Sequence, residues 1–251
     1  MELNLIGKTA LVTGASRGIG LAIATALHRE GCCVALNARQ LNPLQQASSQ
    51  LPGSLPISGD VSCFPEAQRV MAEVIAAWGR LDILVCNVGS GRSVAPGAET
   101  PEEWQRVFAL NLWSSTNMVA AATEALALSQ GTIICISSIC GVEVIPGAPV
   151  TYSAAKAALN AYVRGMARPL GQQGVRINAI APGNILFEGS VWARKLQEDA
   201  AAVTSMLHRD VALKRLGTPE EIANLVCYLA SPRANFATGA LWTLDGGQVR
   251  H

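Results

Sequence analysis

Short apolar runs alternate with amphipathic stretches along the chain. Lys8–Thr13 is an apolar run that leads into a glycine, Ile19–Glu30 carries Ala, Ile and Leu at helical spacing, and Cys32–Leu36 is apolar again. A strand buried in a parallel sheet reads as a continuous apolar run, whereas a covering helix repeats its apolar positions every three to four residues. This order therefore predicts parallel strands joined by helices.

The same alternation continues to the C-terminus. Further strands are predicted at residues 55–59, 81–86, 132–137, 175–180 and 240–244. Further helices are predicted at Pro65–Trp78, Val107–Leu128 and Tyr152–Leu170. Because Pro169 has no backbone N–H group, we expect it to remove a hydrogen bond or to end the last of these helices early. The whole pattern predicts an α/β fold, a doubly wound parallel sheet flanked by helices, in one domain over residues 1–251.

Two tetrads mark the starts of further helices. Thr100-Pro101-Glu102-Glu103 and Thr218-Pro219-Glu220-Glu221 each place a threonine at the N-cap, a proline at the first helical position and a glutamate at the third. They locate helix starts and carry no information on function. The least regular region, residues 184–214, is predicted to be an excursion that covers a ligand as a lid.

Composition narrows the class of protein. The chain has 251 residues, of which 50% are hydrophobic and 15% charged, and its net charge is +1. This balance suits a large core with a buried subunit contact, and it gives no support for binding nucleic acid. Residues 107–155 are nearly free of charge but are interrupted by Asn, Ser, Gly and Pro, so we predict buried structure and no membrane segment. The N-terminus shows no signal-peptide pattern, and we expect a cytoplasmic protein.

The cysteines also favour a cytoplasmic protein. None of the seven forms a C-x-x-C pair, most lie among apolar residues, and the three histidines are scattered. We therefore expect buried thiols in a reducing compartment and no metal site.

A glycine-rich loop, Thr13–Gly20, joins the first predicted strand to the first helix. Its sequence is TGASRGIG, with the spacing G-x-x-x-G-x-G. Glycines allow a sharp turn and a close approach of the backbone to a ligand, and a helix N-terminus attracts an anion. The loop predicts a pyrophosphate site. Its candidate cofactor contacts are Gly14, Ser16, Arg17, Gly18, Ile19 and Gly20.

The end of the second strand indicates which dinucleotide is bound. A carboxylate there would accept the ribose hydroxyls and disfavour a 2′-phosphate. The chain has Asn37-Ala38-Arg39 instead, so Asn37 and Arg39 are candidate contacts. Arg39 can pair with a phosphate, and Arg17 can reach the same region. This favours NADP over NAD.

Tyr152 and Lys156 are the candidate reactive pair. Residues four apart lie on the same face of a helix, one turn apart. A fixed ammonium favours the phenolate, so Lys156 should lower the pKa of Tyr152 from about 10 and tune it for proton transfer. In isolation the pair is also compatible with a packed aromatic and a solvated charge.

Taken together and in order, the motifs closely resemble those of the short-chain dehydrogenase/reductase family over essentially the whole chain. They are TGASRGIG at 13–20, Asp60-Val61, Asn87-Val88-Gly89, Asn111, Ser138, YSAAK at 152–156, Pro182-Gly183 and Asp245-Gly246-Gly247. The resemblance implies a Rossmann-like fold and hydride transfer between a nicotinamide and a carbonyl or carbinol carbon.

The resemblance also implies residue roles. Tyr152 would be the general acid/base, and Lys156 would lower its pKa and bind the nicotinamide ribose. Ser138 would bind the substrate carbonyl, and Asn111 would hold a water that links Lys156 to solvent. Other implied cofactor contacts are Asp60, Val61, Asn87, Gly89, Pro182, Gly183 and Ile185.

Besides Pro169 near the end of the predicted helix Tyr152–Leu170, the chain departs from the family pattern in three places. Cys86 stands where an asparagine is usual. The interval from Ser138 to Tyr152 is one residue longer than the commonest spacing, so the extra residue must bulge in the loop 141–151. The threonine often found after Pro-Gly is missing from Asn184-Ile185-Leu186-Phe187.

The leading hypothesis is an NADPH-dependent reductase of a small carbonyl compound. An NAD(P)-dependent sugar or polyol dehydrogenase is the alternative, and a dinucleotide-binding regulatory protein is a third. Residues 126–131 and 171–174, where relatives that act on acyl carrier protein have basic residues, hold no cation, which argues against that role. Arg92 and Glu143 either meet a polar substrate or lie on the rim. The apolar helices Val107–Leu128 and Tyr152–Leu170 predict a homo-oligomer, a dimer or a tetramer.

Overall fold

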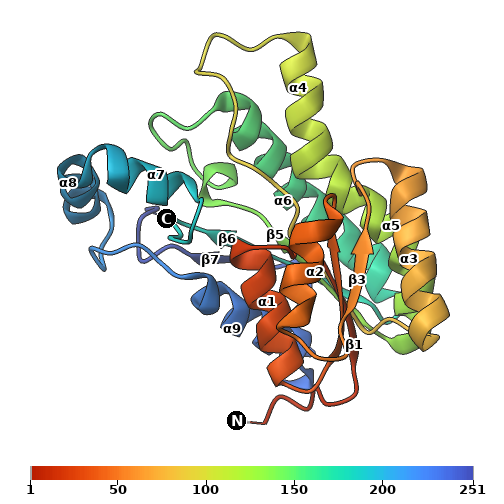
Figure 1. The fold of residues 1–251 in the computed structure, drawn as a ribbon. Helices are drawn as coiled ribbons and strands as arrows, with labels where there is room; N and C mark the ends of the chain where they lie inside the picture. Colours follow the sequence, from red (N-terminus) through yellow and green to blue (C-terminus); the bar gives the residue numbers. More distant parts are fainter. Residues whose placement is uncertain (1, 251) are drawn as a thin grey trace.

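The computed structural model describes residues 2–250 and contains a parallel sheet of seven strands in the order β3-β2-β1-β4-β5-β6-β7. Helices cover both faces of this sheet (Figure 1). The strands are β1 (Thr9–Thr13), β2 (Cys33–Ala38), β3 (Leu55–Ser58), β4 (Ile83–Cys86), β5 (Thr132–Ile136), β6 (Arg176–Pro182) and β7 (Leu241–Leu244). The predicted doubly wound sheet and its strands are confirmed, with ends that differ by up to two residues.

The helices fall into two covering layers and a peripheral group. One layer is α1 (Gly18–Arg29), α2 (Leu41–Ser49) and α9 (Pro219–Ala230), and the other is α3 (Phe64–Trp78), α5 (Ser114–Ser129) and α6 (Val150–Gly171). The remaining helices are α4 (Pro101–Phe108), α7 (Val191–Glu198) and α8 (Ala200–Asp210). The doubly wound arrangement follows, with a core on each face of the sheet.

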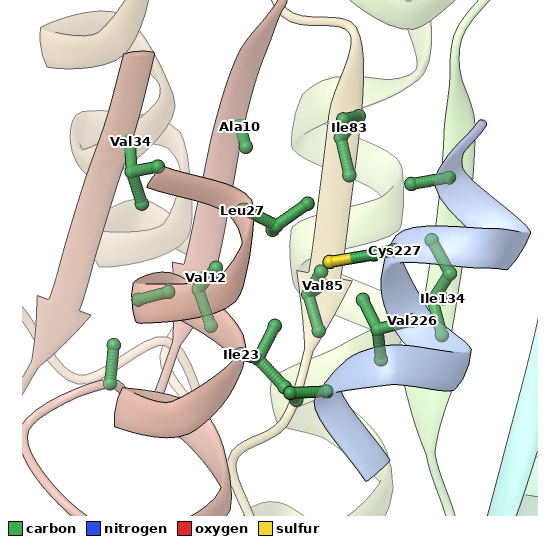
Figure 2. Packing of buried hydrophobic residues seen from close by; sticks show 14 of the residues in the cluster. Ala10, Val12, Ile23, Leu27, Val34, Ile83, Val85, Ile134, Val226 and Cys227 are labelled. Carbon is green, nitrogen blue, oxygen red and sulfur yellow. The ribbon is translucent and has the colours of Figure 1, made fainter. Parts of the chain in front are cut away.

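Strand residues alternate between these two cores. Val12 packs with α1 and α9, whereas its neighbour Leu11 packs with the layer that contains α3 and α5. Figure 2 shows Ile23 and Leu27 of α1 beside Val226 of α9, above the strands. All of these side chains are buried, and each buried Leu, Ile or Val contributes about 1.5–3 kcal/mol. The apolar runs of the sequence are therefore buried on both faces.

Two helical regions differ from the prediction. The helix expected at Val107–Leu128 is longer and irregular: α4 leads through a π turn, Ala109–Trp113, directly into α5. Helix α2 was not predicted, because its sequence LNPLQQASS is polar, contains a proline and has no capping side chain at Gln40.

Helix ends follow the capping signals. At Thr218 both hydrogen bonds of a capping box form, and at Thr100 the hydroxyl accepts from the Glu103 N–H. Pro169 does not end α6 early. The helix runs on to Gly171, because the lost bond falls in its exposed last turn.

Residues 184–214 contain two short helices outside the two covering layers, and their role as a lid over a ligand stays a prediction. These helices, α7 and α8, share a small apolar cluster of Val203, Leu207 and Val211. The expectation of buried thiols holds for Cys32, Cys86, Cys135 and Cys227, but it is wrong for Cys33 and Cys63, which are exposed. Between residues 2 and 250 there is no helix with the length and apolarity needed to cross a membrane, and no cluster of metal-ligating side chains.

Candidate active site

The predicted site residues gather at the carboxyl ends of the strands. Strand order reverses at β1, which lies between β2 and β4, and a parallel sheet binds ligands at such a point. The glycine-rich loop follows β1, Asn87 follows β4, Ser138 follows β5 and Gly183 follows β6. The topology therefore brings together motifs that are far apart in the sequence.

The glycine-rich loop is a tight cradle of backbone groups. Gly14 and Gly18 have positive φ angles of 65° and 58°. A Cβ atom on Gly20 would lie 2.2 Å from the Gly14 carbonyl oxygen, so no side chain fits there. The Asn87 amide holds the loop by donating to the Thr13 and Gly14 carbonyls at 3.0 and 3.2 Å. With helix α1 beginning at Gly18, the cradle fits the pyrophosphate of a dinucleotide.

At the end of β2, the Asn37 side chain is buried and bonds the backbone of the neighbouring strand and loop. It is fully buried, and its Nδ2 donates to the carbonyls of Ile57 and Gly59 at 3.1 and 3.2 Å. Its Oδ1 is buried without a partner. The exposed cation is Arg39, whose Nη1 lies 4.0 Å from the Asp60 carboxylate. A guanidinium, and not a carboxylate, thus faces solvent at this strand end.

Near Arg39, the other expected contacts differ in exposure. Arg17 is exposed, whereas Val61 is buried in the core. Asp60 accepts hydrogen bonds from the Ser62 N–H and hydroxyl at 3.1 and 2.6 Å, which fix its carboxylate. Arg39 therefore lies beside this carboxylate, whereas the Arg17 guanidinium lies near Gly189, where a Cβ atom would be 3.6 Å from its Nη1.

Tyr152 and Lys156 lie in the first two turns of α6. Tyr152 is half-buried against the backbone of Gly91. Lys156 is 3% exposed, and its Nζ donates to the Ile136 carbonyl at 2.8 Å and lies 5.9 Å from the centre of the Tyr152 ring. The helix spacing therefore does place both groups in one site.

The prediction of a lowered phenol pKa is wrong in this structure. Burial raises the pKa of Tyr152 to about 12, although a hydrogen bond with the Ser138 hydroxyl opposes the rise. Burial also lowers the pKa of Lys156 to about 8. Desolvation is the largest cause of both shifts, and the ammonium of Lys156 donates to the Ile136 carbonyl. Near neutral pH the phenol is protonated and the lysine is mostly charged.

Ser138 begins the 3-10 turn Ile139–Gly141 after β5. Its Oγ accepts from the Cys140 N–H at 3.2 Å, and its side chain is nearly buried. The turn lies close against α6, because a Cβ atom on Gly141 would be 2.6 Å from the Lys156 carbonyl carbon. The strand end and the helix together hold Ser138 beside Tyr152.

Asn111 lies in the π turn between α4 and α5 and is fully buried. Its Oδ1 accepts from the Ser90 N–H at 2.9 Å, and its Nδ2 donates to the Ser90 and Val107 carbonyls at 3.2 and 3.0 Å. A Cβ atom on Gly89 would lie 2.9 Å from Asn111 Oδ1 and 3.1 Å from Lys156 Nζ. Asn111 Oδ1 and Lys156 Nζ can therefore both lie close to the Gly89 backbone only because Gly89 has no side chain.

The segment that follows β6 meets the glycine-rich loop. Ile185 is buried and pairs as an isolated bridge with Gly217. The Phe187 ring lies over Gly18, where a Cβ atom would be only 2.5 Å from it. Pro182 ends β6, and Gly183 packs against Asp245. The segment after β6 thus begins between the glycine-rich loop and β7, and sequence reasoning did not identify Phe187 as part of that junction.

Sequence reasoning also missed the contacts that fix the walls of the site. The Ser93 hydroxyl hydrogen-bonds Thr151 at 2.6 Å and Glu103 at 2.7 Å, so the loop after β4 is tied to the turn that carries Tyr152. Glu143 accepts from the Arg250 N–H at 2.9 Å, which holds the C-terminal tail against the loop that carries the predicted extra residue. Residues so distant in sequence give no local signal.

The sequence left open whether Arg92 and Glu143 meet a substrate or lie on the rim. The Arg92 side chain is exposed.

Comparison with known proteins gives consistent matches over the full length. A family model described as enoyl-(acyl carrier protein) reductase matches residues 14–248. Nodulation protein G of Azospirillum brasilense is 37% identical over 96% of this chain and 97% of its own. The 3-oxoacyl-acyl-carrier-protein reductase of Thermotoga maritima is 31% identical over 98% of this chain and 100% of its own. The solved structure of L-sorbose reductase from Gluconobacter frateurii, complexed with NADPH and L-sorbose, is 30% identical with a TM-score of 0.94 and 100% coverage of both chains.

Proposed function

The chain belongs to the short-chain dehydrogenase/reductase family, and we propose that it reduces a small carbonyl compound with NADPH, using Tyr152 as the proton donor. The observation that carries this proposal is the convergence of three side chains: Lys156 is buried with its Nζ 5.9 Å from the centre of the Tyr152 ring, and the Ser138 hydroxyl hydrogen-bonds Tyr152. A phenol with a pKa of about 12 holds its proton at neutral pH and is therefore suited to donate it, which favours reduction.

The residues present would hold the cofactor along the carboxyl ends of the strands. Gly14, Ser16, Gly18, Ile19 and Gly20 would bind the pyrophosphate through the loop and the start of α1. The 2′-phosphate would meet the exposed guanidinium groups of Arg17 and Arg39.

The rest of the cofactor would extend from Asp60 toward the lid. Asp60 and Val61 would flank the adenine, with Asn37 fixing the strand end that supports them. Asn87 and Gly89 would line the middle, and Lys156 would bind the nicotinamide ribose. Pro182, Gly183 and Ile185 would lie at the nicotinamide end. Once bound, NADPH supplies the hydride.

The protein's own groups then act on the carbonyl oxygen. Ser138 donates a hydrogen bond to that oxygen and steadies the negative charge that develops on it. Tyr152 transfers its phenolic proton to the same oxygen, which completes the alcohol. The charged Lys156 favours the phenolate that remains, and Asn111, next to Lys156 across Gly89, assists its exchange of protons with solvent.

Two substrate classes fit the proposed reaction, namely simple carbonyl compounds and sugars or polyols. The L-sorbose reductase structure covers the whole chain and was solved with a sugar and NADPH, which favours reduction of a sugar or polyol as the second candidate. Docking of an acyl carrier protein is disfavoured, because residues 126–131 and 171–174 carry no cation to meet an acidic partner. A ketone and sugar panel with NADPH and NADH distinguishes these candidates.

Replacement of Tyr152 tests the proposed function. Tyr152→Phe removes only the transferable proton, so we expect turnover to be lost while NADPH still binds. Both are measurable, by the loss of absorbance of NADPH and by a fluorescence titration. Turnover near the wild-type rate in this variant would refute the assignment.

We also propose that the chain acts as one domain and assembles as a dimer or tetramer through α5 and α6. Trp113 and Leu128 are 44% and 86% exposed on this side and would be covered by a second copy. Light scattering that finds a stable monomer would contradict this. Free cysteines agree with action in the cytoplasm, which cell fractionation would test.

A further inference from the structure

We propose that Asn160 and Ser137 form a positioning pair that sets Ser138 at the correct distance from Tyr152. The inference rests on the proposed function, because it assumes that Ser138 binds the substrate carbonyl. It concerns residues that take no part in the steps described above.

Asn160 lies on α6 one turn beyond Lys156, and only 5% of its surface is exposed. Its Oδ1 accepts a hydrogen bond from the Ser137 hydroxyl at 2.5 Å, and its Nδ2 donates to the Gly141 carbonyl at 2.9 Å. One side chain amide therefore joins the helix that carries Tyr152 to two points on the segment that carries Ser138.

These two points enclose Ser138. Ser137 precedes it at the end of β5, and Gly141 ends the short turn that follows it. The turn has its own hydrogen bond, from the Gly141 N–H to the Ser138 carbonyl at 3.0 Å. The Ser137 hydroxyl also lies 3.4 Å from the Lys156 carbonyl, so both ends of the segment are fixed to α6.

This arrangement has a direct consequence for the reaction. Hydrogen bonding to an oxyanion and proton transfer both require that the reacting groups be held to within a few tenths of an ångström. The Ser138 hydroxyl accepts from the Cys140 N–H at 3.2 Å and also hydrogen-bonds Tyr152. The bond to Tyr152 depends on where the backbone on either side of Ser138 lies, and Asn160 and Ser137 hold that backbone.

A double-mutant cycle tests the pair. Asn160→Ala should lower kcat by about 10- to 100-fold, the loss expected for a misplaced catalytic group, while the Kd for NADPH stays unchanged. If Asn160 acts through Ser138, then Asn160→Ala should lower kcat by less than about 2-fold when Ser138 is already alanine.

Asn178→Ala is the matched control. Asn178 is a fully buried amide that also joins two backbone segments, by donating to Ala237 at 2.8 Å and accepting from Ala240 at 3.2 Å. It pairs with Ile134 of β5 and makes no hydrogen bond to the segment 137–141 among those described. Its effect should multiply with that of Ser138→Ala. Should Asn160→Ala fail to fold, Ser137→Ala removes one hydroxyl from the same pair and should give a smaller loss with the same dependence on Ser138. Ser137→Thr keeps the hydroxyl and should restore activity.

The outcomes separate this inference from the proposed function. Losses of kcat in Asn160→Ala and Ser138→Ala that simply multiply would overturn the positioning role. A Ser138→Ala variant with wild-type kcat would instead overturn the proposed function of Ser138.

Discussion

Replacing Lys156 by methionine is expected to make the protein more stable while it removes the activity. Lys156 is 3% exposed, and the only hydrogen bond described for its ammonium is with the Ile136 carbonyl. A charge in this position is costly to bury, because one carbonyl replaces a full shell of water. Methionine has a similar straight chain and carries no charge, so it should fill the same space.

The pKa of Lys156 gives the magnitude. Burial lowers it from 10.5 to about 8, and each pKa unit corresponds to about 1.4 kcal/mol, so the charged form destabilises the fold by about 3 kcal/mol at neutral pH. Methionine removes this cost but leaves the Ile136 carbonyl without its donor, which costs about 1 kcal/mol. The net gain of about 2 kcal/mol corresponds to a rise in Tm of roughly 4–8 °C for a chain of this size.

The sign of the pH dependence follows from proton binding. Between about pH 8 and 10.5 the unfolded chain keeps the Lys156 proton and the folded protein has released it. The stability of the wild type therefore rises with pH through this window relative to that of Lys156→Met. Thermal unfolding followed by circular dichroism at pH 7 and pH 10 measures both effects, with Lys214→Met at an exposed lysine as the control. A Tm for Lys156→Met at or below that of the wild type at pH 7 would refute this reasoning, as would a difference that does not shrink by pH 10.

Three further changes probe other parts of the site. Arg39→Asp replaces the exposed cation at the end of β2, so the ratio of kcat/KM for NADPH to that for NADH should fall by about 10- to 100-fold. An unchanged ratio of kcat/KM values would show that Arg39 does not contact the 2′-phosphate of NADPH. Gly20→Ala forces a Cβ atom against the Gly14 carbonyl, so it should destabilise the fold by about 1–3 kcal/mol and weaken NADPH binding, whereas Gly171→Ala, which has open space, should do neither. Glu143→Ala releases the C-terminal tail and should raise the KM for the carbonyl substrate without changing the Kd for NADPH. Glu143→Gln keeps an acceptor for the Arg250 N–H and should behave as the wild type; equal effects of the two variants would contradict this.

The site could be predicted from the sequence because most of its motifs lie directly after a predicted strand. Once the order of strand and helix predicts a parallel sheet, residues that follow each strand must meet at one edge, and Asn87, Ser138 and Gly183 do so. Local spacing also predicted both helix starts at threonine. These successes depend on short-range patterns, which a sequence displays directly.

The failures concern long-range contacts and burial. No spacing rule links Phe187 to Gly18, or Glu143 to Arg250, because these pairs meet only after the chain has folded. The pKa of Tyr152 was predicted in the wrong direction, since its sign depends on how much water the fold removes. For Asn160 a signal was present: it is a single amide among apolar neighbours, one turn after Lys156.

The π turn at Ala109–Trp113 determines where the chain can tolerate the deletion of a residue. A π turn holds one more residue than the α-helical turn it replaces. Deleting one residue there would restore regular helix geometry and rotate Asn111 by about 100° relative to α5. Its amide would leave Ser90, although no residue of the catalytic set had been replaced. Single-residue deletions in this helix should therefore inactivate the enzyme without unfolding it, while deletions in the exposed loop before α4 should be tolerated.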